Sequence, residues 1–293
     1  MSQIFDALKR SGAMIPALDS SSGPARDLGV AALDQVPCFQ PHESKHHRLP
    51  VLSDEPNIGA EKIHMLTTRL CHLQRKKALK TVLITSSIKD EGKSVLAANI
   101  ALSLAGTQQR VLLLDGDCHQ SSLTALLGTT DLGGLEGWWR TDQPVATYFT
   151  KMKTLPLWFL AAGRPFRQVL EMLQSLRLSA LLSQLTATFD WVIIDSPPLA
   201  PLADAGIWSN LADATLLVVR LKRTPTKVLS KVLESIDKRK LLGVVLNDCT
   251  DRHLAYYSQY YKNILAPKNS PQKHATNSIR EVPLSPQKPG LTK

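Results

Sequence analysis

The stretch from Thr81 to Ser94, TVLITSSIKDEGKS, constrains the fold of this chain more than any other part of the sequence. It begins with an apolar, β-branched run at 81–84, which is typical of a buried strand. A polar loop follows and ends in Gly92-Lys93-Ser94, after which VLAANIALSLA has the apolar spacing of an amphipathic helix. A strand, a loop with Gly-Lys-Ser and a helix in this order predict a phosphate-binding loop of the Walker A type.

Each part of this motif has a physical role. Backbone N–H groups of the loop and of the helix N-terminus point toward a phosphate. Lys93 reaches the β- and γ-phosphates of a nucleotide, and the Ser94 hydroxyl binds its Mg²⁺. The usual motif carries Gly five positions before Gly92, where this chain has Ser87. The predicted nucleotide contacts are Ser87, Asp90, Glu91, Gly92, Lys93, Ser94 and Val95.

Three acidic residues follow two further apolar runs. The run VLLL leads into Asp115 and Asp117, and the run WVII leads into Asp195. Because the carboxyl ends of parallel strands meet at one edge of a sheet, we expect these acids beside the phosphate-binding loop. Mg²⁺ binds hard oxygen ligands, so the three acids and Ser94 form a predicted Mg²⁺ site. For any single acid, a simple turn residue is the alternative.

Strand-like runs alternate with helical patterns through the middle of the chain. The strands are predicted at 81–84, 111–114, 157–161, 191–194, 214–219 and 241–246. The helices are predicted at 57–77, 94–105, 166–186, 202–211 and 226–237, with a break near Ser175 in the third. This alternation predicts an α/β protein with a doubly wound, mostly parallel sheet. Asn247 follows the last strand, either as a turn residue or as a side chain that contacts an adenine edge.

The two ends of the chain differ in composition from its middle. Residues 1–12 predict a short amphipathic helix, and 13–56, rich in Ser, Pro, Asp and Gly, predict a disordered linker. The nucleotide-binding domain is predicted at 57–251. A tyrosine-rich segment at 252–261 precedes a basic tail at 262–293, whose Pro-, Ser- and Lys-rich composition also predicts disorder.

The net charge and the cysteines indicate what kind of partner the protein binds and in which cell compartment it lies. The formal net charge of +10 favours an anionic partner, and a solvated basic surface is the alternative. The four cysteines form no Cys-x-x-Cys pair and follow no secretory signal, which predicts reduced thiols in the cytoplasm. No apolar run approaches the length that a membrane-spanning helix needs, so none is predicted.

Together these motifs resemble those of the bacterial tyrosine kinases (BY-kinases), within the wider group of MinD/ParA-like P-loop ATPases. The resemblance rests on TSSIKDEGKSVLAANIA, VLLLDGDCHQSSL, WVIIDSPPLAPLADA, LLVVR and GVVLN, and covers about residues 57–261. It is strongest to the soluble cytoplasmic subunit of exopolysaccharide and capsule systems. Four of the five tyrosines fall at 256–261, as in the C-terminal tyrosine cluster of that family. An aromatic stripe that packs a helix or an interface is the alternative for this cluster.

The resemblance implies a reaction and its participants. Lys93 and Ser94 would hold ATP and Mg²⁺, Asp115 and Asp117 would form the Walker A′ motif that also activates the tyrosine hydroxyl, and Asp195 would be the Walker B acid. The implied phosphate acceptors are Tyr256, Tyr257, Tyr260 and Tyr261. The implied partners are a membrane-embedded activator in a separate chain and further copies of this chain, with no nucleic acid. The implied location is the cytoplasm, at the inner face of the cell membrane.

The sequence departs from the family pattern at several positions. Asp90 replaces a loop glycine, His119 replaces an arginine, and Asp248 follows Asn247 where ATPase relatives often have a basic residue. A Glu-x-x-Arg-x-x-Arg motif of the ring interface aligns with Glu61, His64 and Thr67, which leaves ring assembly open.

Two alternative functions also stay open. They are a MinD/ParA-type ATPase switch and a nucleotide-binding scaffold with weakened kinase activity. Ile88 stands where the switch proteins carry a signature lysine, which favours the kinase.

Overall fold

The computed structural model describes residues 33–42, 47–53, 57–129, 132–200 and 203–248. They all belong to one compact unit of the chain. The predicted helix at 1–12, the tyrosine cluster at 256–261 and the basic tail lie outside the described residues. Their predictions therefore stay predictions.

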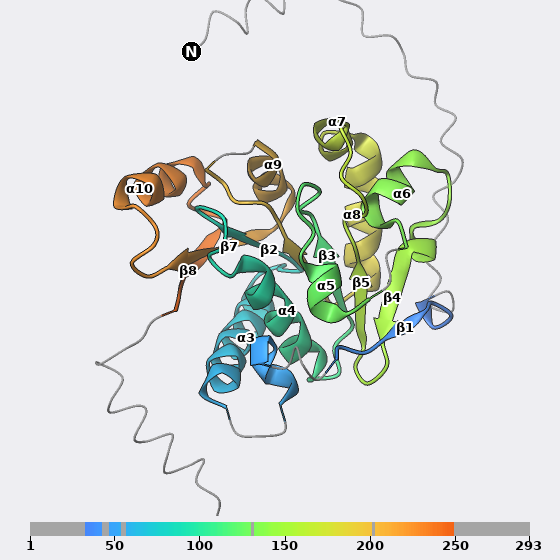
Figure 1. Cartoon of the computed structure of the whole chain (residues 1–293), viewed down its shortest axis with the longest axis horizontal. Coiled ribbons are helices and arrows are strands. Elements are labelled where there is room, and N and C mark those ends of the chain that lie inside the picture. Colours follow the sequence, from blue (N-terminus) through green and yellow to red (C-terminus); the bar gives the residue numbers. More distant parts are fainter. Residues whose placement is uncertain (1–32, 43–46, 54–56, 130–131, 201–202, 249–293) are drawn as a thin grey trace, which may run out of the picture. The chain divides into compact units, whose positions relative to one another are not determined.

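One eight-stranded sheet runs through the described part of the chain (Figure 1), in the order β1-β4-β5-β3-β6-β2-β7-β8. Every neighbouring pair is parallel except β4 and β5, which are antiparallel. The fold class predicted from the sequence is confirmed. The strands are β1 (Cys38–Phe39), β2 (Thr81–Ser86), β3 (Val111–Asp115), β4 (Phe149–Met152), β5 (Leu157–Leu160), β6 (Trp191–Asp195), β7 (Ala214–Arg220) and β8 (Leu241–Asn247).

Strand β2 is an interior strand, and every one of its residues is buried. It pairs with β6 on one side and with β7 on the other. The six predicted strands are all present, and β3 and β6 extend by one residue to include Asp115 and Asp195. The acids therefore end the strands inside the hydrogen-bonded sheet instead of following them in a loop.

Helices cover both faces of the sheet. One face packs against α3, α4 and α5 through strand residues such as Val82 and Leu113. The other face packs against α6 to α9 through Leu83 and Leu112, and against α10 through Leu217. The helices are α3 (Ile58–Lys76), α4 (Lys93–Ala105), α5 (Leu123–Leu127), α6 (Gly134–Arg140), α7 (Val169–Leu173), α8 (Leu176–Thr188), α9 (Ala203–Leu211) and α10 (Thr226–Ser235), with short 3₁₀ turns η2 (Pro50–Leu52) and η3 (Val145–Tyr148).

The predicted break near Ser175 is confirmed, because α7 ends before it and α8 begins after it. The Ser175 hydroxyl accepts a hydrogen bond from Leu178 N at 3.1 Å, as an N-cap residue does. The sequence analysis missed α5, α6 and β4. These elements have four to seven residues each, too few for a helical or strand period to stand out.

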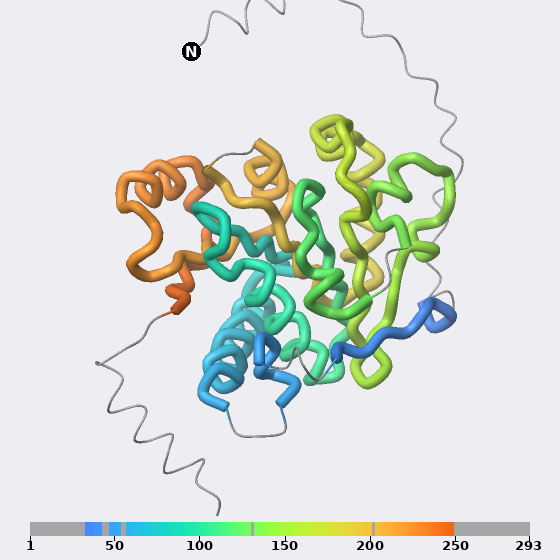
Figure 2. The backbone as a smooth tube through the Cα atoms, in the orientation of Figure 1, coloured from blue at the N-terminus to red at the C-terminus, as the bar shows by residue number. Residues whose placement is uncertain are grey.

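The linker predicted at 13–56 differs from the structure, since its described residues belong to the fold. Cys38–Phe39 form edge strand β1 beside β4. Leu33 and Leu49 are fully buried, and η2 packs against α3 and α4. Figure 2 shows this segment running beside β4 and then beside α4. The Ser- and Pro-rich composition of this segment predicts a linker, but a few separate apolar side chains such as Leu33 and Leu49 are buried in the core.

We predict that Leu49→Ala lowers the free energy of unfolding by about 2–5 kcal/mol, the usual cost of a cavity at a fully buried leucine. The matched control is Leu176→Ala, because Leu176 is 89% exposed and its truncation should change stability by less than about 0.5 kcal/mol. Denaturant unfolding measures both. Equal stabilities for Leu49→Ala and wild type would show that this segment does not belong to the folded domain.

Candidate nucleotide-binding site

The loop between β2 and α4 has the backbone that a phosphate-binding loop needs. Gly92 has a φ of 94°, and a Cβ added there would lie only 2.2 Å from Nδ2 of Asn247. Only glycine fits this position, on grounds of both backbone strain and space. Asp90 has a φ of 65°, a left-handed conformation that Asp adopts more readily than most residues. Helix α4 begins directly afterwards at Lys93, so its free N–H groups face the loop.

Glu91 holds this loop against the ends of β7 and β8. Its carboxylate is buried and accepts hydrogen bonds from Ile88 N at 2.9 Å, from Arg220 N at 3.2 Å and from the Thr224 hydroxyl. Its carbonyl oxygen accepts one from Asn247 Nδ2 at 2.9 Å. Sequence reasoning missed Arg220 and Thr224, because no local pattern marks residues that support a loop about 130 positions away.

The structure places Asn247 on the loop. Its amide nitrogen donates to the Glu91 carbonyl, and its side chain is not among those that line the cavity described below. Contact between Asn247 and an adenine base stays a prediction.

Lys93 brings two of the predicted acids together. Its Nζ lies 3.0 Å from Oδ2 of Asp117 and 3.7 Å from Oδ1 of Asp195. It also donates to the Ser94 hydroxyl at 3.2 Å. Burial alone would lower the pKa of Lys93, but the carboxylates of Asp195 and Asp117 outweigh burial and raise it. The lysine therefore stays charged beside the acids.

Asp115 and Asp195 lie directly opposite each other on neighbouring strands β3 and β6. Asp115 uses its oxygens within the protein, accepting from Asp117 N at 3.1 Å and from the Ser121 hydroxyl at 2.6 Å. Asp195 is also buried, yet neither of its carboxylate oxygens receives a hydrogen bond in the described part of the chain. Asp115 thus supports the site from behind, whereas Asp195 keeps free acceptor capacity.

Burial, and next the neighbouring charge of Asp195, raise the pKa of Asp115 to about 8. Burial also raises the pKa of Asp195, to about 6, although the ammonium of Lys93 opposes this shift. Two carboxylates this close cannot both ionise without cost. A cation held at this edge would remove that cost.

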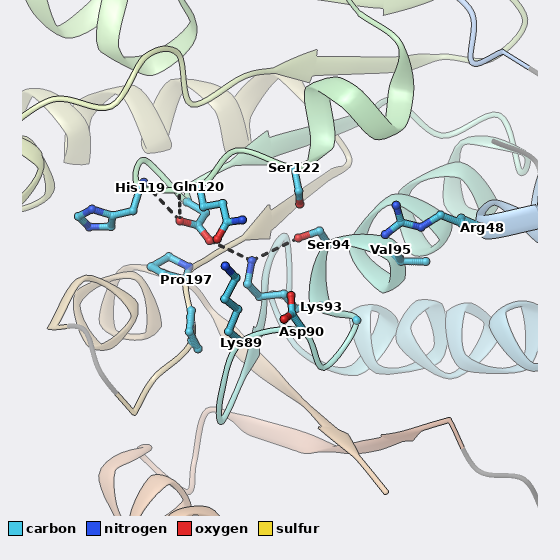
Figure 3. A pocket seen from close by; sticks show the side chains of 13 residues that line it. Arg48, Lys89, Asp90, Lys93, Ser94, Val95, His119, Gln120, Ser122 and Pro197 are labelled. Carbon is cyan, nitrogen blue, oxygen red and sulfur yellow. Dashed lines mark hydrogen bonds and ion pairs between the residues drawn. The ribbon is translucent and has the colours of Figure 1, made fainter. Parts of the chain in front are cut away.

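A cavity of about 300 Å³ opens in front of Lys93 (Figure 3). Its cations are Arg48, Lys89 and Lys93, and its acids are Asp90 and Asp117. The remaining lining residues are Gly92, Ser94, Val95, His119, Gln120, Ser122, Pro197 and Pro198. Of all the lining residues, Arg48, Lys89, His119, Gln120, Ser122 and the two prolines were not predicted as site residues.

The Asp90 carboxylate is 59% exposed and lies 3.5 Å from Nη2 of Arg223. A cationic partner and water both weaken its repulsion of a phosphate. The departure from a loop glycine is therefore tolerated in the fold.

The ring of His119 contacts Asp204 and not the nearby Asp117. Its Nε2 lies 2.6 Å from Oδ2 of Asp204, a buried residue near the start of α9, while its backbone N donates to Oδ1 of Asp117 at 3.3 Å. Gln120 N donates to the same oxygen at 3.0 Å. The turn after β3 thus fixes Asp117 through its backbone, without the arginine that the family pattern carries.

The side chains at two of the ring-motif positions bond within this chain. Thr67 is buried, and its hydroxyl lies 2.9 Å from that of Ser103 on α4. His64 Nδ1 also lies 2.9 Å from the Ser103 hydroxyl. Both positions therefore contribute to the packing of α3 on α4.

The described residues fit Mg²⁺ and a nucleotide. Asp195 offers two buried oxygens without donors, and Ser87 offers a buried hydroxyl oxygen without a partner in the described part of the chain. Among the described residues, no three His, Cys, Asp or Glu side chains gather into a metal site of their own. Mg²⁺ needs only one or two carboxylates when phosphates and water complete its shell. Asp117, Asp195 and Ser94 would provide the protein ligands.

A mostly parallel sheet with a glycine-lysine-serine loop at its carboxyl edge, facing aspartates at or just after the ends of two neighbouring strands, defines a P-loop nucleotide-binding protein. The chain belongs to the ParA family. The family model, described as NUBPL iron-transfer P-loop NTPase, matches residues 78–287.

Curated relatives of the chain are bacterial tyrosine-protein kinases and polysaccharide proteins. The tyrosine-protein kinase YwqD of Bacillus subtilis (strain 168) is 29% identical over 222 residues, which cover 74% of this chain and 92% of YwqD. The succinoglycan biosynthesis transport protein ExoP of Rhizobium meliloti (strain 1021) is 34% identical over 189 residues, or 62% of this chain. Those residues make up 24% of ExoP, so the chain spans about a quarter of that relative.

A solved structure of the chimerical protein CapA2B2 has the same fold. It superposes with a TM-score of 0.66 at 24% identity and covers 74% of this chain and 94% of its own. The predicted resemblance to bacterial tyrosine kinases is confirmed by these relatives.

The described helices include none with the length and apolar character that a membrane span requires.

We predict that replacing Asp115 by Asn changes stability in a pH-dependent way. The folded protein holds the Asp115 proton up to about pH 8, whereas the ordinary value is 3.8, so this acid loses stabilising effect as pH rises through that window. The amide does not titrate. The free energy of unfolding of Asp115→Asn relative to wild type should therefore increase between about pH 4 and pH 8.

Denaturant unfolding of the metal-free protein across this range makes the measurement. Asp142→Asn is the control, because Asp142 is exposed and its loss should give a flat difference. An equally flat difference for Asp115→Asn would contradict the inference that Asp115 is strained by burial and by Asp195.

Proposed function

We propose that this chain is an ATP-dependent protein-tyrosine kinase that acts in exopolysaccharide or capsule biosynthesis. The observation that carries the proposal is the position of Lys93, held between Asp117 and Asp195 at the carboxyl edge of β3 and β6. The similarity to YwqD across 92% of that kinase's length favours a kinase over other nucleotide-dependent functions.

The chain's own residues would bind and orient the nucleotide. Backbone N–H groups from 87–95 face the phosphates, and Lys93 moves from its acid partners to the β- and γ-phosphates. Because Glu91 ties the loop to β7 and β8, these contacts would help to hold its N–H groups in position for the phosphates. Mg²⁺, when bound by Ser94, Asp117 and Asp195, would supply charge neutralisation.

The proposed reaction transfers a phosphoryl group to tyrosine. The phenolic oxygen forms a bond to the γ-phosphorus, the bond from that phosphorus to the bridging oxygen breaks, and ADP leaves. The phenolic proton passes to a carboxylate, for which we assign Asp117, because it lies in the turn after β3 and lines the cavity. Such a reaction requires mainly positioning and electrostatic stabilisation.

Acceptors, partners and location are parts of the same proposal. The acceptors are Tyr256, Tyr257, Tyr260 and Tyr261, which a second copy of the chain presents to the cavity. ExoP is named a transport protein, and this chain matches about a quarter of it, which supports a membrane-embedded partner in a separate chain. The protein then works in the cytoplasm at the inner face of the membrane.

One observation favours the second candidate, a nucleotide-binding scaffold with weakened kinase activity. At the two positions where the ring motif has arginines, this chain has His64 and Thr67, whose side chains hydrogen-bond to Ser103 of the same chain. If copies do not assemble, tyrosines of one copy do not reach the site of another. Phosphorylation would then be slow even though ATP binds.

We predict that the full chain, incubated with Mg²⁺ and ATP, gains phosphate on residues 256–261. The incubation is done alone and with the cytosolic segment of a co-encoded polysaccharide chain-length regulator. Lys93→Met should lose the phosphate, with a fall in rate of at least about a hundredfold, because Lys93 is the lysine of the Gly-Lys-Ser loop that would hold the β- and γ-phosphates. Mass spectrometry locates the modified tyrosines.

The matched control is Lys62→Met, which removes a lysine from the exposed side of α3 and should leave the rate unchanged. ATP binding without phosphotyrosine in either incubation would favour the scaffold. ATP hydrolysis without phosphotyrosine would favour the ATPase switch.

A further inference from the structure

Residues 47–53, here termed the N-terminal arm, pack against α4, the helix that follows the phosphate-binding loop. Leu49 is fully buried in the core cluster that contains α4. The Arg48 carbonyl oxygen accepts a hydrogen bond at 2.9 Å from Nδ2 of Asn99, itself buried on α4. The 3₁₀ turn η2 then packs between α3 and α4. The backbone at Arg48 is therefore held by burial on one side and by a hydrogen bond on the other.

The Arg48 side chain enters the nucleotide cavity from this arm. It lines the cavity together with Lys93 and Val95, although about 45 residues of sequence separate it from them. In the described part of the chain, its guanidinium has no ion pair and no hydrogen bond. Arg48 thus presents a cation whose charge no described side chain balances.

The position of Arg48 within the cavity indicates which part of a nucleotide it meets. Figure 3 shows Arg48 beside Val95, on the side away from His119 and Gln120. The acids that face Lys93 mark the other end, where the β- and γ-phosphates lie. Val95 follows the Gly-Lys-Ser sequence and lies in the first turn of α4, at the end of the cavity where the phosphate nearer the nucleoside would lie (Figure 3).

We propose that Arg48 binds the α-phosphate of the nucleotide, so that the N-terminal arm completes the nucleotide site. This inference rests on the proposed nucleotide binding, but not on kinase activity. A guanidinium offers five N–H donors and stays charged at any physiological pH, so it suits a phosphate oxygen at this end of the cavity. Lys93 and Arg48 then hold opposite ends of the phosphate chain.

The test measures the affinity of the full-length protein for Mg²⁺-ATP, ADP, AMP and adenosine by isothermal titration calorimetry. Arg48→Gln should weaken ATP, ADP and AMP by a similar factor, about five- to twentyfold, since all three carry the α-phosphate. The affinity for adenosine should not change. Arg48→Lys should retain part of the affinity. The difference between Arg48→Gln and wild type should shrink as the salt concentration rises.

The matched control is Arg69→Gln, which removes an exposed arginine from α3 outside the cavity. It should leave every affinity unchanged. Thermal unfolding checks that Arg48→Gln folds as wild type does, as expected for an exposed side chain.

Unchanged affinities in Arg48→Gln would overturn the assignment, and so would an equal loss for adenosine. A loss confined to phosphorylation of the tyrosines, with nucleotide affinity intact, would instead assign Arg48 to the acceptor and also overturn it. Lys93→Met separates this inference from the proposed function. If it binds ATP as wild type does, the nucleotide site itself is wrongly placed. If wild type binds ATP but never forms phosphotyrosine, only the kinase proposal fails.

Discussion

The ammonium of Lys93, held between the carboxylates of Asp117 and Asp195, is the interaction on which the site depends. Asp115 and Asp195 are brought side by side by the register of β3 and β6, in a position where both lose hydration. Such a pair costs free energy unless a cation lies close by. Lys93 provides that cation in the structure described, and a nucleotide with Mg²⁺ would take over its role. The repulsion between these two carboxylates would therefore favour the binding of a cation at this edge of the sheet.

The loop that carries Lys93 is supported from distant parts of the chain. Glu91 receives donors from the end of β7 and from the turn after it, and its carbonyl receives the amide at the end of β8. On the other side, the N-terminal arm is anchored on α4. These contacts restrain the backbone of the loop, which lowers the ordering entropy that phosphate binding costs. Through these contacts, residues near both ends of the described part of the chain, Arg48 and Asn247, bond to the loop or to α4.

The departures from the family pattern have different consequences in three dimensions. Asp90 is accommodated, since it lies half in water beside Arg223. His119 gives its ring to Asp204 and leaves its backbone to hold Asp117. Thr67, however, is buried against α4 and cannot present a charge to a second copy. The departures at Asp90 and His119 are therefore accommodated within the fold, whereas His64 and Thr67 leave the ring-motif positions without the arginines of the bacterial tyrosine kinase pattern.

The sequence by itself determined the sheet, the phosphate-binding loop and the strand-end acids. Apolar runs and Gly-Lys-Ser are local signals, and parallel strands bring their carboxyl ends together whatever the details of packing. Only the tertiary structure decided that Asp115 accepts hydrogen bonds from Ser121 and Asp117, that Thr224 supports Glu91 and that Arg48 reaches the cavity. These contacts join residues separated by dozens of positions, and no local period records them. The N-terminal arm was misjudged for the same reason, because a few buried side chains such as Leu49 outweigh a loop-like composition.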